Sequence, residues 1–99
     1  MIVAIDYDDT ISLNHNLWQE VINTFNSFGA KVYVVTYRES TRFQDMKIPE
    51  GVIDTVFTNA QAKREYCEEM GIDIDIWIDD SPESVIFGYS DLVKHMKIR

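Results

Sequence analysis

Short runs rich in β-branched residues alternate along this chain with segments of helical periodicity, and this alternation restricts the fold more than any other feature. The short runs are residues 2–5 (IVAI), 31–36 (KVYVVT), 52–58 (VIDTVFT) and 74–80 (IDIWIDD). Each is shorter than a typical helix and is bounded by polar residues, which predicts a strand. Because strands that alternate with helices form a parallel sheet covered on both faces, we predict a three-layer, Rossmann-like α/β fold.

Two segments between these runs have the spacing of helices. Residues 17–28 carry apolar side chains at intervals of three and four, and Gly29 is placed to end that helix. Residues 62–70 predict a second helix, which Gly71 ends. The remaining connection, residues 39–51, predicts a short helical turn followed by a loop.

The length of 99 residues predicts a single domain, residues 1–99. Near its end a helix can start at Pro82, and residues 94–99 fit either a helix end or a small edge strand. No apolar stretch approaches membrane-spanning length and no signal peptide is recognisable, so we expect a cytoplasmic protein without a membrane partner. Cys67 is expected to pack in a helix rather than to react, and His95 to lie on the surface.

The net charge of −8 limits the partners of this chain. Proteins that bind the phosphate backbone of nucleic acids cluster Lys and Arg, so nucleic-acid binding is not expected. A small phosphorylated substrate remains open, because an acidic protein can bind phosphate through a metal ion or a few well-placed cations.

Polar residues follow three of the predicted strands at the point where each strand ends. They are Asp6, Asp8 and Asp9 after the first strand, Thr36 and Arg38 after the second, and Asp79 and Asp80 after the last. In parallel sheets ligands bind at the carboxyl ends of the strands, so these residues could meet at one edge. Carboxylates that close repel one another unless a cation lies among them. The cluster is therefore either a set of solvated turns or a site built for a cation and a reaction.

Four motifs in this order resemble those of the haloacid dehalogenase-like (HAD) phosphohydrolases. The residues DYDDT at 6–10 fit the first motif, DxDx[T/V], and VYVVT ending in Thr36 is similar to the second. Lys63 stands near a helix start, as the third-motif lysine does, and IWIDDSP at 76–82 resembles the fourth motif. The resemblance covers residues 2–84 and implies a HAD-like fold and a phosphatase activity.

The resemblance implies roles for the two aspartates of the first motif. Asp6 would attack a phosphoryl group and form an aspartyl-phosphate. Asp8 would protonate the leaving oxygen and later deprotonate the water that hydrolyses the intermediate. In the family the residue after the second aspartate is often glycine and the residue after the second-motif threonine is often small, whereas here they are Asp9 and Tyr37.

A magnesium ion would complete this site. The resemblance implies that Mg²⁺ bridges Asp6, the backbone carbonyl of Asp8 and an acid of the fourth motif. We favour Asp80 as the direct ligand and Asp79 as one that acts through water or by contact with other ligands. The ion would share the charge of the aspartates with the substrate phosphate.

Thr36 and Lys63 would bind phosphoryl oxygens, the lysine also offsetting the acidic cluster. Arg38 is likewise placed to contact the substrate phosphate. The third-motif role stays open between Lys63, Arg38 and Arg64, because all three are cations near predicted strand or helix ends.

No segment is long enough for the cap domain that many HAD enzymes carry. Residues 9–17 and 38–52 are the two places where a cap is inserted in the family, and both are short. Capless relatives act on large or terminal phosphates or use an oligomeric partner as a cover, so either is expected here. A HAD-fold protein that binds metal or a partner without turnover is the alternative. A response-regulator receiver domain is disfavoured, since its threonine and phosphorylated aspartate follow other strands.

Overall fold

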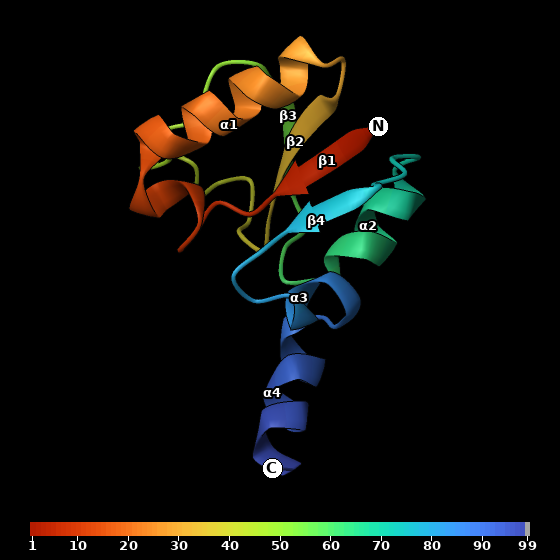
Figure 1. Cartoon of the computed structure of the whole chain (residues 1–99). Helices are drawn as coiled ribbons and strands as arrows, with labels where there is room; N and C mark the ends of the chain where they lie inside the picture. Colours follow the sequence, from red (N-terminus) through yellow and green to blue (C-terminus); the bar gives the residue numbers. More distant parts are fainter. Residues whose placement is uncertain (99) are drawn as a thin grey trace.

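An all-parallel sheet of four strands forms the centre of the computed structural model, which describes residues 1–98 and the side chains of residues 1–94 (Figure 1). The strands are β1 (Ile2–Ile5), β2 (Lys31–Thr36), β3 (Val52–Phe57) and β4 (Ile76–Ile78), in the order β3-β2-β1-β4. The predicted α/β class, the parallel sheet and its strands are confirmed. The chain adds β2 and β3 on one side of β1 and β4 on the other, so its path changes direction at β1.

One face of the sheet packs on α1 (His15–Ser27), which follows a short 3₁₀ helix, η1 (Ile11–Leu13). Asn14 caps α1 by accepting a hydrogen bond from the Leu17 N–H group. Ile22 is fully buried against β1 and β2 residues of this face. Gly29 follows the helix with a φ of 83°, the left-handed conformation that glycine adopts most readily, as predicted.

The opposite face packs on α2 (Lys63–Glu69), which connects β3 to β4. Its core contains Ala4, Val35, Val56 and Cys67, with Trp77 packed against them. The Cys67 side chain is fully buried, which confirms the packing role expected for it. Helices thus cover both faces of the sheet, as the three-layer prediction requires (Figure 1).

The connection from β2 to β3 contains turns and no helix, so the short helical turn predicted in residues 39–51 is wrong. Side-chain hydrogen bonds, and not a periodic pattern of apolar residues, determine the conformation of this segment. Arg38 donates hydrogen bonds to the Arg42 carbonyl and to the Asp45 carboxylate, and these bonds wrap the chain around the arginine. Gln19 of α1 holds the far end through both backbone groups of Glu50.

The C-terminal part forms two helices, α3 (Glu83–Ile86) and α4 (Tyr89–Ile98). The choice left open for residues 94–99 is therefore decided in favour of a helix as far as residue 98. In Figure 1, α4 extends away from the sheet, beyond its carboxyl edge. The side chain of His95, expected on the surface, lies outside the described residues.

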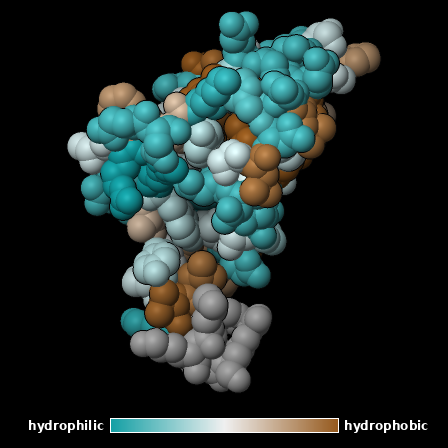
Figure 2. All heavy atoms as spheres, turned by 90° about the vertical axis from the view of Figure 1, so that its left-hand side faces the viewer, coloured by the Kyte–Doolittle hydropathy of each residue, from teal (hydrophilic) through white to brown (hydrophobic). Residues whose placement is uncertain are grey.

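The surface seen from the left-hand side of Figure 1 is largely hydrophilic, with separate hydrophobic patches (Figure 2). Exposed apolar side chains include Leu13 of η1, Leu17 of α1 and Phe28, which directly follows α1. Among the helices of residues 1–98, none has the length and apolar character needed to cross a membrane.

The burial of Cys67 predicts that its thiol is unreactive in the native protein. Burial raises the pKa of this thiol to about 11, so the reactive thiolate is scarce at pH 8. We expect an aromatic disulfide reagent to label Cys67 slowly in buffer and at once in concentrated urea. Complete labelling in buffer within the time of mixing would contradict the buried position.

Candidate active site

Residues from the ends of β1, β2 and β4 and from the start of α2 line one pocket of about 290 Å³ at the carboxyl edge of the sheet. Its lining contains the predicted site residues Asp6, Asp8, Thr36, Lys63, Asp79 and Asp80. It also contains Asp9, Tyr37, Ser81, Ser84, Tyr89 and Leu92. The structure thus brings together six of the residues that the sequence singled out, from four separate elements.

Lys63 lies between two carboxylates at the base of this pocket. Its ammonium Nζ is 2.8 Å from Asp6 Oδ1 and 2.6 Å from Asp79 Oδ2, and the residue is only 2% exposed. Parallel pairing of β1 with β4 sets Ile5 opposite Ile78, so Asp6 and Asp79 are the next residues of neighbouring strands. The lysine therefore neutralises the two acids that strand pairing brings together.

A turn with left-handed backbone positions the start of α2. Asn59 and Ala60 have φ values of 51° and 63°, which non-glycine residues rarely adopt. The Ala60 N–H group donates to the Tyr37 carbonyl at 2.8 Å, and the Thr58 N–H group donates to the Thr36 carbonyl at 2.9 Å. These bonds fasten the turn to the end of β2 and direct Lys63 into the pocket.

Asp6 and Asp80 are joined through the hydroxyl of Thr10, a residue of the first motif to which the sequence analysis gave no role. Thr10 Oγ1 lies 3.3 Å from Asp6 Oδ2 and 3.4 Å from Asp80 Oδ1, within donating distance of both carboxylates. Burial raises the pKa of Asp6 to about 7, and the nearby Asp80 adds to the rise, while Lys63 partly offsets it. Asp6 is thus a buried carboxylate whose charged form depends on cations beside it.

The acids of this pocket fit a hard metal ion. Oxygens of Asp6, Asp79 and Asp80 all lie within 4.8 Å of one another, and carboxylate oxygens are the ligands that Mg²⁺ and Ca²⁺ prefer. Asp79 accepts the most hydrogen bonds of the three: its oxygens accept from Lys63, from the Ser81 N–H group and from the Ser84 hydroxyl. Asp80 is exposed and borders the pocket opening.

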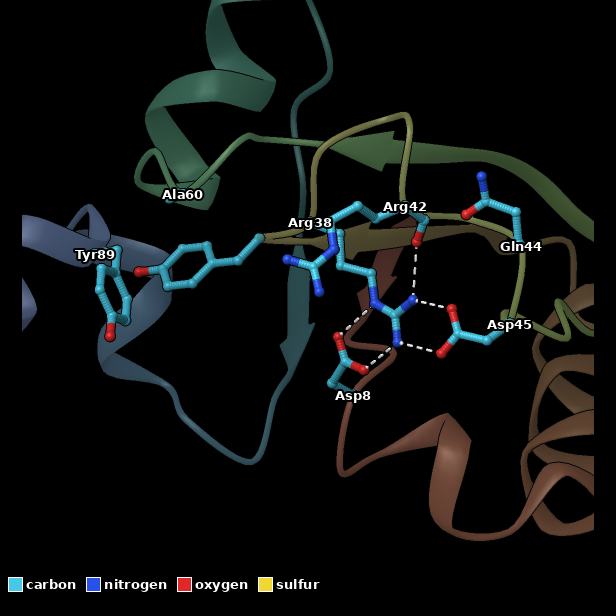
Figure 3. A pocket seen from close by; sticks show the side chains of 8 residues that line it. Asp8, Arg38, Arg42, Gln44, Asp45, Ala60 and Tyr89 are labelled. Carbon is cyan, nitrogen blue, oxygen red and sulfur yellow. Dashed lines mark hydrogen bonds and ion pairs between the residues drawn. The ribbon is translucent and has the colours of Figure 1, made fainter.

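Asp8 is held by Arg38 on the other side of the pocket (Figure 3). Arg38 Nε and Nη2 donate to the two Asp8 oxygens at 3.0 and 2.7 Å. The same guanidinium donates to both oxygens of Asp45 and to the Arg42 carbonyl. Every N–H group of the guanidinium is therefore used, and hydrogen bonds to Asp8 and Asp45 raise the pKa of Arg38 above its usual range.

Thr36 and Tyr37 complete the wall between these two clusters. The buried Thr36 hydroxyl accepts a hydrogen bond from the Arg38 N–H group at 3.2 Å, and among the described residues it donates to no acceptor. Its hydrogen is thus available to a ligand in the pocket. The Tyr37 ring lies 5.4 Å from Lys63 Nζ, and its hydroxyl donates to the Phe87 carbonyl. Burial raises the pKa of Tyr37 to about 12, so it stays a neutral donor.

Several features of the site had little signal in the sequence. Asp9 has a φ of 60°, which explains how a residue other than glycine fits after Asp8, since aspartate tolerates this conformation better than most residues. The contacts of Asp45 and Ser84 arise from chain folding, and no local pattern marks them. Thr10 ends the DYDDT motif, but the motif gave no sign of its contact with Asp80. Arg64, the alternative to Lys63, is exposed and does not line the pocket.

In comparisons with known proteins, no protein-family model, no curated protein and no solved structure matches the chain.

The Lys63 contacts predict a large loss of stability when the ammonium is removed. Lys63→Met leaves Asp6 and Asp79 buried without their cation, and breaking one side of a buried ion pair costs about 3–5 kcal/mol. Urea unfolding in the presence of a chelator measures this loss. Arg64→Met is the matched control, because an exposed neighbour on the same helix should change the free energy of unfolding by about 0.5 kcal/mol or less. Equal midpoints for the two variants would refute the buried ion cluster.

Proposed function

We propose that this chain is a Mg²⁺-dependent phosphomonoester hydrolase of the HAD type, which acts through an aspartyl-phosphate on Asp6. The observation that carries the proposal is the position of Asp6. Its carboxylate lies between the Lys63 ammonium and the Asp80 carboxylate, in the pocket that the Thr36 hydroxyl also lines. A nucleophile, a cation and a hydroxyl donor around one opening are what phosphoryl transfer to a carboxylate requires.

The reaction divides into two steps. In the first, an Asp6 oxygen attacks phosphorus, the bond from phosphorus to the leaving oxygen breaks, and Asp8 gives that oxygen a proton. In the second, Asp8 takes a proton from water, the water oxygen attacks phosphorus, and the Asp6 carboxylate and inorganic phosphate are released. Asp8 suits both steps because its side chain is half exposed and borders the pocket that holds Asp6.

Lys63 and Thr36 would bind the phosphoryl oxygens during both steps. The lysine is already fixed by Asp6 and Asp79, so it needs little reorganisation when a phosphoryl group arrives. The Thr36 hydroxyl is held from the other side by the Arg38 N–H group. Both donors therefore belong to rigid parts of the sheet edge.

Asp6, Asp80 and the Asp8 backbone carbonyl would hold the magnesium ion, with Asp79 acting through water. Bound Mg²⁺ would offset the charge of the carboxylates and of the phosphoryl group. Three groups of the protein already donate hydrogen bonds to the Asp79 oxygens, which supports the indirect role. The exposure of Asp80 supports the direct one.

The proposal includes a capless domain that works in the cytoplasm. The connection from β2 to β3 is only a wrapped loop, so cover for the pocket would come from a large substrate, a terminal phosphate on a macromolecule, or an oligomeric partner. A domain that binds metal or a partner without turnover is the alternative, and the next experiment separates the two.

The proposed nucleophile predicts that Asp6→Asn abolishes hydrolysis of p-nitrophenyl phosphate, an activity that also requires a divalent ion. Asp8→Asn should slow an alkyl phosphate far more than p-nitrophenyl phosphate, because a good leaving group needs little protonation. Steady-state kinetics on the wild type and both variants measure this, with Asp73→Asn, an exposed acid before β4, as the control. Full activity of the Asp6→Asn variant would exclude Asp6 as the nucleophile. A wild type that binds Mg²⁺ without hydrolysis supports the alternative.

The proposed metal site predicts two opposite effects of Asp80→Asn. In chelator the variant should melt above the wild type, since Asp80 no longer disfavours the charged form of Asp6. With Mg²⁺ at a hundredfold excess over Kd the wild type should gain about 2.7 kcal/mol and the variant much less. Each kcal/mol moves the melting temperature of a domain this size by about 4–8 °C. If Mg²⁺ leaves the wild-type melt unmoved, the cation site is wrong.

A further inference from the structure

A second pocket, of about 650 Å³, adjoins the candidate active site and is not used by the mechanism above. Asp8, Tyr37 and Tyr89 line both pockets, so the two are continuous past Asp8. Arg38, Arg42, Gln44, Asp45 and Ala60 line the second pocket alone. Figure 3 shows it from close by, with Tyr89 on the side opposite Gln44 and Asp45.

The position of this pocket makes it the place for the leaving group, an assignment that rests on the proposed function. The group that protonates the leaving oxygen must lie beside that oxygen, and Asp8 has this role in the proposed reaction. Whatever part of the substrate lies beyond the leaving oxygen therefore extends past Asp8, into the pocket that Asp8 shares with Arg42 and Tyr89.

Two arginines line this pocket, and only one of them is free to bind a ligand. The Arg38 guanidinium is saturated by Asp8, Asp45 and the Arg42 carbonyl, so it positions Asp8 and has no donor left for a substrate. The Arg42 guanidinium makes no ion pair with any carboxylate among the side chains of residues 1–94. Arg42 is exposed and is thus the available cation of the pocket.

We propose that this pocket is a leaving-group subsite, in which Arg42 binds a second anionic group of the substrate, a carboxylate or a phosphate. An arginine pairs with either anion through two parallel hydrogen bonds. Tyr37 and Tyr89 supply aromatic surface for the body of the leaving group, and the Gln44 amide supplies a neutral donor and acceptor. The preferred substrate is therefore a phosphomonoester whose leaving group is itself an anion.

Binding of non-hydrolysable arylphosphonates to the wild-type protein, measured by calorimetry with Mg²⁺ at low salt, tests this subsite. The probes are phenylphosphonates that carry a meta-carboxylate, a meta-phosphonate or a meta-carboxamide. A charge-assisted bond to Arg42 should make an anionic probe bind about tenfold more tightly than the carboxamide. The anionic probe whose affinity exceeds that of the carboxamide by the larger factor shows whether the second anionic group of the substrate is a carboxylate or a phosphate.

Arg42→Gln should reduce the ratio of these affinities to about one, whereas Arg64→Gln, an exposed arginine on α2 outside both pockets, should retain it. Equal affinities in the wild type, no binding of any probe, or a ratio that survives Arg42→Gln would each overturn the proposal. Hydrolysis of phenyl phosphate by the same preparation tests the proposed function separately. If the preference is present and hydrolysis is absent, the anion subsite stands and the phosphatase assignment falls.

Discussion

The Lys63 ammonium, held between the carboxylates of Asp6 and Asp79, is the interaction on which the rest of the site depends. Burial of a lysine is costly, and excellent geometry with more than one hydrogen-bonding partner is needed to offset the loss of water. Two carboxylates meet the ammonium because β1 and β4 are in parallel register, with Ile5 opposite Ile78. A shift of one residue would turn one acid away. The strand register and the start of α2 therefore together determine whether the lysine and the two carboxylates are paired.

Backbone strain beside this cluster shows how the lysine is aimed. The left-handed conformations of Asn59 and Ala60 cost about 1–2 kcal/mol each, so the surroundings must hold them in place. The Ala60 N–H group donates to the carbonyl of Tyr37, which follows β2. The Ala60 carbonyl accepts from the Tyr89 N–H group at the start of α4. The strained turn is thus fastened on both sides. A relaxed turn would start α2 at another angle and move Lys63 away from the acids.

Much of the fold and the site could be predicted because both depend on where strands end. Thr36 and the paired acids follow runs of unmistakable strand character, and a parallel sheet brings such positions to one edge. The segment 39–51 could not be predicted, because the hydrogen bonds of one arginine determine its shape and no periodicity reports them. Asp45 and Arg42 come from this segment, so their contacts and their pocket were hidden in the sequence.

Two of the cations around the site, Lys63 and Arg38, form ion pairs with described carboxylates, and Arg42 forms none. Lys63 and Arg38 are each shared by two carboxylates, so neither leaves net positive charge for a substrate. Both cations fix the acids in place. In the proposed reaction a divalent ion would therefore supply the net positive charge that attracts a phosphoryl group, and Lys63 would serve as a hydrogen-bond donor to it. Arg42 differs from these two cations because it forms no ion pair with a carboxylate among the described side chains. In the proposed function, metal recognition of the phosphoryl group and arginine recognition of the leaving group would therefore depend on different residues, on opposite sides of Asp8.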